Sequence, residues 1–160
     1  YLLRQQELPD PSLVDQILVV INNLVSVAAV QVLENATDEN ISTIRGLLEP
    51  LIREDSSNDS HNAARFELMK NIMLASNNLP LLLIARTLFE QFAPTISAIG
   101  FYAVPDRARY ALYARQLDIA LTNRDLQAMR ATFDAFTELN RETMARAFLL
   151  AERGQEAIAR

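Results

Sequence analysis

The longest apolar stretch of the chain covers residues 13–33, and its hydrophobic residues occupy nearly every face of a helix. Five polar residues interrupt it: Asp15, Gln16, Asn22, Asn23 and Gln31. Because such residues are costly in hydrocarbon, the pattern predicts a buried central helix over 13–34 rather than a membrane span. Ser12 is expected to cap its first turn.

Five further segments repeat their hydrophobic residues every three or four positions, which is the period of a helix buried along one face. Their apolar positions run over residues 41–51, 66–73, 82–99, 110–121 and 126–150. Polar residues before three of these segments are the expected helix caps: Thr37, Ser60 and Asp125. Pro94 lies inside the fourth segment and predicts a kink near Glu90.

The predicted connections are short, with a polar loop over 54–60 and a turn at Asn77 and Asn78. Short connections place consecutive helices antiparallel. With a short leading helix over 2–7, the pattern predicts an all-α antiparallel bundle of six to seven helices. We expect one domain over residues 1–160, in which 1–11 form the end of a linker and the short helix.

Composition and charge limit the partners. The 160 residues carry a net charge of −5 and a single lysine, Lys70, so the chain lacks the clustered cations that grip DNA phosphates. With no cysteine, it has no disulfide framework and no thiolate metal site. The sequence begins at Tyr1 without a signal segment, and we expect a cytoplasmic fragment of a longer protein.

The sequence contains few of the His and Cys side chains that often act as nucleophiles, bases or metal ligands in enzymes. The one histidine, His61, stands beside the polar loop and is expected at the surface. Without Cys, and with one His, the usual nucleophile and metal arrangements cannot be assembled. No phosphate-binding glycine motif occurs. We therefore predict no enzyme and no cofactor.

The apolar line of the last helix is interrupted by Asn140 and Thr143. One interpretation is that the two are exposed, or are buried and satisfied by neighbouring helices. The other is that they face a cavity in which a ligand needs polar partners.

Two turns carry a family resemblance. Phe-Glu-Leu-Met at 66–69 leads to Ala-Ser-Asn-Asn at 75–78, which is similar to a helix ending in an Ala-Ser-Gly-Asn-Pro turn. Leu-Thr-Asn-Arg-Asp at 121–125 precedes the last helix and is similar to a Gly-Asp turn. In order and spacing these turns resemble the FCD domain, the ligand-binding domain of FadR-type GntR transcriptional regulators, over about residues 12–148. Residues 23–27 resemble the acyl-CoA-responsive branch best.

Most members of that family hold a metal with an Asp and a His four residues apart and two further His. The corresponding positions here are Arg65, Met69, Ala114 and Phe136, none of which is such a ligand. The resemblance therefore implies no metal site in this chain. A family arginine that suits small anionic ligands falls at Ala28, which disfavours a small dicarboxylate or sugar acid.

What the resemblance leaves is a mainly apolar pocket with a few polar points. Its expected lining is Arg65, Met69, Phe92, Tyr113, Ala114, Phe136 and Asn140. Such a lining suits an acyl chain, since each buried methylene contributes about 0.8 kcal/mol. Arg65 is either an anchor for the phosphates of a thioester or a solvated residue near the polar loop.

The resemblance thus implies an effector-sensing domain that forms a homodimer and binds a fatty acyl-CoA or a similar apolar molecule. It would contact DNA only through a winged-helix domain absent from this chain. The alternative is a ligand-independent dimerisation or interaction module with a filled core, in which Asn140 and Thr143 are packed polar residues.

Overall fold

The computed structural model describes residues 8–53, 55–100 and 102–158, and all the regular structure in these ranges is helical. The six helices are α1 Pro11–Asn35, α2 Asp38–Ile52, α3 Asn58–Ala75, α4 Leu79–Gly100, α5 Arg107–Asn123 and α6 Leu126–Ile158. The predicted all-α bundle is confirmed. The short helix predicted over 2–7 lies outside the described residues.

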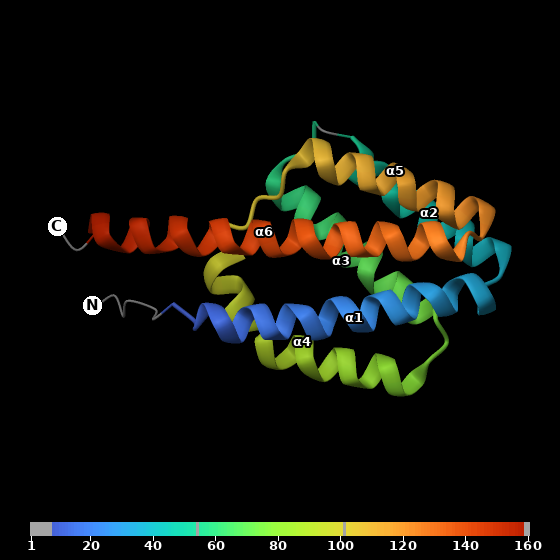
Figure 1. Ribbon diagram of the computed structural model, residues 1–160, viewed down its shortest axis with the longest axis horizontal. Helices are drawn as coiled ribbons and strands as arrows, with labels where there is room; N and C mark the ends of the chain where they lie inside the picture. The colour runs from blue at the N-terminus through green and yellow to red at the C-terminus, as the bar shows by residue number, and fades with distance from the viewer. Residues whose placement is uncertain (1–7, 54, 101, 159–160) are drawn as a thin grey trace.

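The helices are arranged in layers around α6, the longest of them (Figure 1). α1 packs along one side of α6, and α5 packs along the other. α2 covers α3 and α5, while α4 lies at the edge against α1. α3 contacts α1 on one side and α2 on the other, so it lies between these two helices, with its remaining face exposed.

The helix starts follow from side chains that accept hydrogen bonds from the first backbone amides. The predicted caps Thr37 and Asp125 are confirmed, since they accept from Asn40 N at 3.2 Å and from Ala128 N at 3.0 Å. The predictions for Ser12 and Ser60 are wrong. α1 begins two residues earlier, after the cap Asp10, and α3 begins three residues earlier, after the cap Ser57. Each of these cap oxygens accepts from the predicted cap's own amide (Ser12 N, 2.9 Å; Ser60 N, 3.2 Å).

Two turns place non-glycine residues in the left-handed conformation. Asn77 has φ 55° after α3, as expected from its tolerance of this region. Arg124 has φ 48° after α5. Its guanidinium donates to the carbonyl oxygens of Leu33 and Ala36, each at 2.9 Å, and to Asp38. Arg124 therefore ties the turn before α6 to the connection between α1 and α2.

α4 contains Pro94 and still continues to Gly100. Figure 1 shows that its last turns run in a different direction from its first part, which confirms the predicted kink. Proline removes one helix hydrogen bond and its ring crowds the preceding turn, so a bend is the expected outcome.

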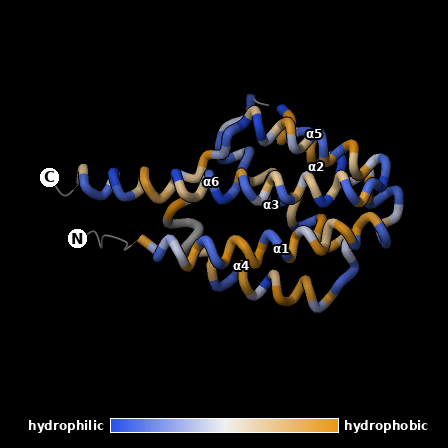
Figure 2. Tube along the Cα trace, viewed as in Figure 1, coloured by the Kyte–Doolittle hydropathy of each residue, from blue (hydrophilic) through white to orange (hydrophobic). Residues whose placement is uncertain are grey.

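α1 is the one helix among the described residues that is long and apolar enough to cross a membrane by length and composition. Eight of its residues are nevertheless buried against other helices. Figure 2 shows apolar colouring along most of α1 and α4, whereas α6 alternates with polar residues. α1 is therefore a core helix that also leaves an apolar face uncovered.

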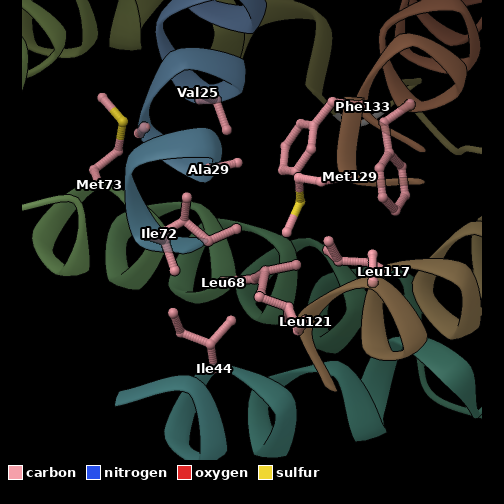
Figure 3. Packing of buried hydrophobic residues seen from close by; sticks show 14 of the residues in the cluster. Val25, Ala29, Ile44, Leu68, Ile72, Met73, Leu117, Leu121, Met129 and Phe133 are labelled. Atoms are coloured by element: carbon pink, nitrogen blue, oxygen red, sulfur yellow. The ribbon is translucent and has the colours of Figure 1, made fainter. Parts of the chain in front are cut away.

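All six helices contribute to the main core cluster, and a smaller cluster joins Val14 of α1, Ile99 of α4 and Phe148 of α6. Figure 3 shows Leu68 and Ile72 of α3 between Val25 and Ala29 of α1 on one side and Ile44 of α2 on the other. Leu48, Leu117 and Leu139 have no exposed surface. Burial of such side chains contributes about 1.5–3 kcal/mol each, and Leu68 and Ile72 fix α3 between α1 and α2 in the same way.

Candidate functional site

A polar cluster lies where α3, α5 and α6 meet, and we call its four residues, His61, Arg65, Tyr110 and Asn140, the Arg65 cluster. Arg65 Nη2 donates to Asn140 Oδ1 at 2.8 Å, which joins α3 to α6. The guanidinium carbon lies 5.1 Å from the centre of the Tyr110 ring on α5. The predicted pair Arg65 and Asn140 is thus in direct contact.

His61 is buried, with 1% of its surface exposed, so the prediction of a surface histidine is wrong. Because α3 begins at Asn58, residue 61 falls on the same helical face as Leu68 and Ile72. The imidazole meets the Tyr110 ring edge-on at a centroid distance of 4.8 Å. Neither of its nitrogens has a hydrogen-bond partner among the described residues.

The surroundings of His61 favour its neutral form. Burial lowers the pKa of His61 to about 4, and the positive charges of Arg107 and Arg65 act in the same direction. Burial also raises the pKa of Tyr110, more than Arg65 lowers it. At neutral pH the imidazole and the phenol are therefore uncharged, and the arginines carry the charge of the site.

Three arginines in the described part of the chain are half-buried, and they differ in the partners of their guanidinium groups. Arg109 forms an ion pair with the carboxylate of Glu142, whereas Arg65 and Arg107 donate to uncharged oxygens. Arg107 Nη2 donates to the carbonyl oxygen of Ser56 at 3.1 Å and to its hydroxyl at 2.6 Å. Arg65 has amide partners, Asn140 and Asn62. Within the described ranges neither guanidinium forms an ion pair with a carboxylate. Both positive charges act on His61, and Arg107 also acts on the carboxylate of Asp55, so Arg65 is the better candidate to bind an anion.

Aromatic rings adjoin the Arg65 cluster on its apolar side. The Phe136 ring lies 4.9 Å from that of Tyr110, 5.7 Å from that of Tyr113 and 6.1 Å from that of Phe133. These distances are typical of packed aromatic pairs. Two of the predicted pocket residues, Tyr113 and Phe136, are thus in contact with each other, and their rings fill this part of the bundle.

The other predicted pocket residues belong to the same core. Ala114 is fully buried on α5. Met69 of α3 and Phe92 of α4 are half-buried and pack against the main cluster. Five of the seven residues thus belong to the main core cluster or pack against it, and the other two, Arg65 and Asn140, bond to each other.

The two polar residues of the last helix have partners within the protein. Asn140 accepts from Arg65, and the buried Thr143 hydroxyl donates to the carbonyl oxygen of Leu139 at 2.7 Å. Thr143 is thus satisfied by its own helix, as is common for Thr in helix interiors.

A hollow of about 410 Å³ opens next to the Arg65 cluster. Its walls include Asn58, Asp59 and Asn62 of α3, Tyr102 of the connection after α4, and Arg146 and Leu150 of α6. Asn62 is shared, since its Oδ1 accepts from Arg65 Nη1 at 3.3 Å. Asn62 therefore separates the hollow from the Arg65 cluster and contacts both.

Sequence reasoning identified Arg65 and Asn140 but missed His61, Tyr110 and Arg107 as parts of the site. The spacing of four between His61 and Arg65 was an available signal, because it places both on one helical face. Nothing in the sequence indicated that Arg107 lacks a carboxylate partner.

No group of three or more His, Cys, Asp or Glu side chains able to hold a metal occurs in the part of the chain that the structure describes. No protein-family model matches the chain, and comparisons with curated proteins and with solved structures found no significant similarity.

Proposed function

We propose that the chain is the effector-sensing and dimerisation domain of a FadR-type GntR transcriptional regulator, and that its effector is an anionic amphipathic molecule of the fatty acyl-CoA class. The observation that carries this proposal is the pair Arg65 and Arg107 beside the buried His61. Two guanidinium groups without carboxylate partners, at the edge of an aromatic core, suit a ligand with a negative head and an apolar chain.

The backbone of the two turns supports the family part of the proposal. The described chain has two non-glycine residues with positive φ, Asn77 and Arg124. In the family's Ala-Ser-Gly-Asn-Pro and Gly-Asp turns, glycine stands at these two positions. Glycine is the residue that favours the left-handed conformation, so both turns keep the backbone that the family sequences require.

The expected arrangement of the ligand follows from the site. Phosphates of the head group would bind near Arg65, entering by the hollow beside Asn62. The acyl chain would lie along Phe136 and Met69 and displace part of the packed aromatic side chains. About 0.8 kcal/mol per buried methylene is available to offset that displacement.

A second candidate is the ligand-independent interaction module, and the packing of the bundle centre favours it. Phe136 contacts three other aromatic rings, and Ala114, Leu117 and Leu139 beside it have no exposed surface. In this case Arg65 serves to fix α3 against α6 through Asn140.

Calorimetric titration with acyl-CoA thioesters of increasing chain length distinguishes the two candidates. We expect affinity to rise with chain length, and Arg65→Gln to weaken binding about tenfold or more because a charge-assisted contact is lost. Free coenzyme A and free fatty acid, titrated separately, assign the contributions of head and chain.

Arg115→Gln is the matched control, since Arg115 is an exposed α5 arginine with no ion pair in the described chain. Its binding curve should equal that of the wild type. If no thioester produces heat or a thermal shift, the effector proposal is wrong and the interaction module stands.

A further inference from the structure

The outward face of α1 carries a regular stripe of exposed residues. Leu13, Val20 and Val27 follow one another every seven positions and are 47%, 45% and 48% exposed. Gln16 and Asn23 lie between them on the same face and are also exposed. We call these five residues the outer stripe. Single exposed apolar residues are common on protein surfaces, whereas here three of them share one helical face with no charged residue between them on that face.

The outer stripe is free of charge. α1 has two charged residues in 25, whereas α6 has nine in 33. One of the two, Asp15, faces α6 and pairs with Arg141 at 3.0 Å. The other, Glu34, lies beyond the stripe near the end of the helix. Depletion of charge is the compositional mark of the centre of a protein–protein interface.

The order of residues along the stripe is self-complementary. Val20 is seven residues from Leu13 and seven from Val27, and Gln16 and Asn23 lie on either side of it. A second copy of α1, antiparallel and related by a two-fold axis at Val20, would place Val20 against its own equivalent and Leu13 against Val27. Gln16 would then lie near Asn23 of the second copy, where one side-chain amide can donate to the other.

The two amides favour a second copy over a lipid surface. In hydrocarbon, Gln16 and Asn23 would lose their hydrogen bonds to water without replacement. Between two antiparallel helices they replace each other's water and fix the register, as a polar residue does in a coiled-coil seam.

We infer that the outer stripe of α1 is the surface on which two copies of this chain form an antiparallel, two-fold dimer. The inference rests on the dimerisation part of the proposed function and names the face that performs it. The contact extends from Leu13 to Val27, a rise of about 21 Å along the helix.

Sedimentation velocity over a range of protein concentrations tests the inference with Val20→Lys. This change places two ammonium groups against each other at the two-fold axis. We expect the dissociation constant of the dimer to rise about a hundredfold or more. Ile119→Lys is the matched control, because Ile119 is an exposed apolar residue on α5, and its dimer should equal that of the wild type. Thermal melts confirm that both variants are folded.

A cysteine variant gives an independent readout. The chain has no cysteine, so Val20→Cys introduces a single thiol. Under mild oxidation it should give a disulfide-linked dimer, while Ile119→Cys should remain monomeric.

Several outcomes overturn the inference. One is a wild-type chain that stays monomeric at all concentrations, and another is a dimer that survives Val20→Lys. Co-sedimentation of a monomeric chain with phosphatidylglycerol vesicles, lost in Val20→Lys, would assign the stripe to lipid instead. Titration of the wild type and of Val20→Lys with acyl-CoA separates this test from the effector proposal. If the wild type forms a dimer that Val20→Lys dissociates, but binds no thioester, only the effector proposal is wrong.

Discussion

Acidification from pH 6.5 to pH 4 is expected to remove about 3 kcal/mol of unfolding free energy through His61 alone. The pKa of His61 is about 4 in the folded protein and 6.5 in an exposed histidine, so between these values the unfolded chain binds the extra proton. Stability therefore falls as pH drops through 6.5 and stops falling, for this residue, near pH 4. Urea unfolding at a series of pH values measures the loss.

His61→Phe is the control for this prediction. Phenylalanine keeps a ring against Tyr110 and has no group that titrates, so the loss assigned to residue 61 should disappear from its pH profile. Carboxylates titrate in both proteins and cancel in the comparison. Because the chain has one histidine, its imidazole proton resonance reports the pKa directly. A midpoint near 6.5 would contradict the buried, uncharged state.

Arg124→Ala is expected to destabilise the protein by about 3 kcal/mol. The guanidinium donates to the carbonyl oxygens of Leu33 and Ala36 and to Asp38, and its removal leaves the end of α1 without these partners. Alanine also keeps the strained left-handed backbone at φ 48°. Thermal and chemical unfolding of the variant measure the effect.

Arg124→Gly separates the two contributions of this residue. Glycine loses the same hydrogen bonds but adopts the left-handed conformation freely, so it should be about 1 kcal/mol more stable than the alanine variant. Arg86→Ala, which removes an exposed pair with Glu90 on α4, should have a much smaller effect. Equal stabilities of all three variants would show that the Arg124 contacts do not hold the turn.

The helices could be predicted because the apolar period is regular and the turns have specific chemistry. Thr37, Asn77 and Asp125 mark boundaries by properties of their own side chains. The cap predictions at Ser12 and Ser60 were wrong for a local reason. In each case a side-chain oxygen of an earlier residue, Asp10 or Ser57, accepts from the first backbone amides instead. Sequence reasoning gives no rule for which of two adjacent caps is used.

The site was predictable only where a polar residue interrupts an apolar line. Asn140 was predicted in this way, and Arg65 was predicted as a pocket residue because it aligns with a metal-ligand position of the family that the sequence resembles. His61 was assigned to the surface because polar neighbours surround it in sequence, yet the phase of α3 turns it inward. The unpaired state of Arg107 depends on which carboxylates reach it in space, and such distances are not encoded in local sequence.

The position of α3 between α1 and α2 has a mechanical consequence. Its first turns line the hollow, and its middle packs against Val25 and Ala29 of α1 (Figure 3). Close-packed interiors transmit small displacements rather than absorbing them. If the proposed effector binds beside the first turns of α3 and two copies associate through α1, any factor by which the bound molecule changes self-association is also the factor by which self-association changes the affinity for that molecule.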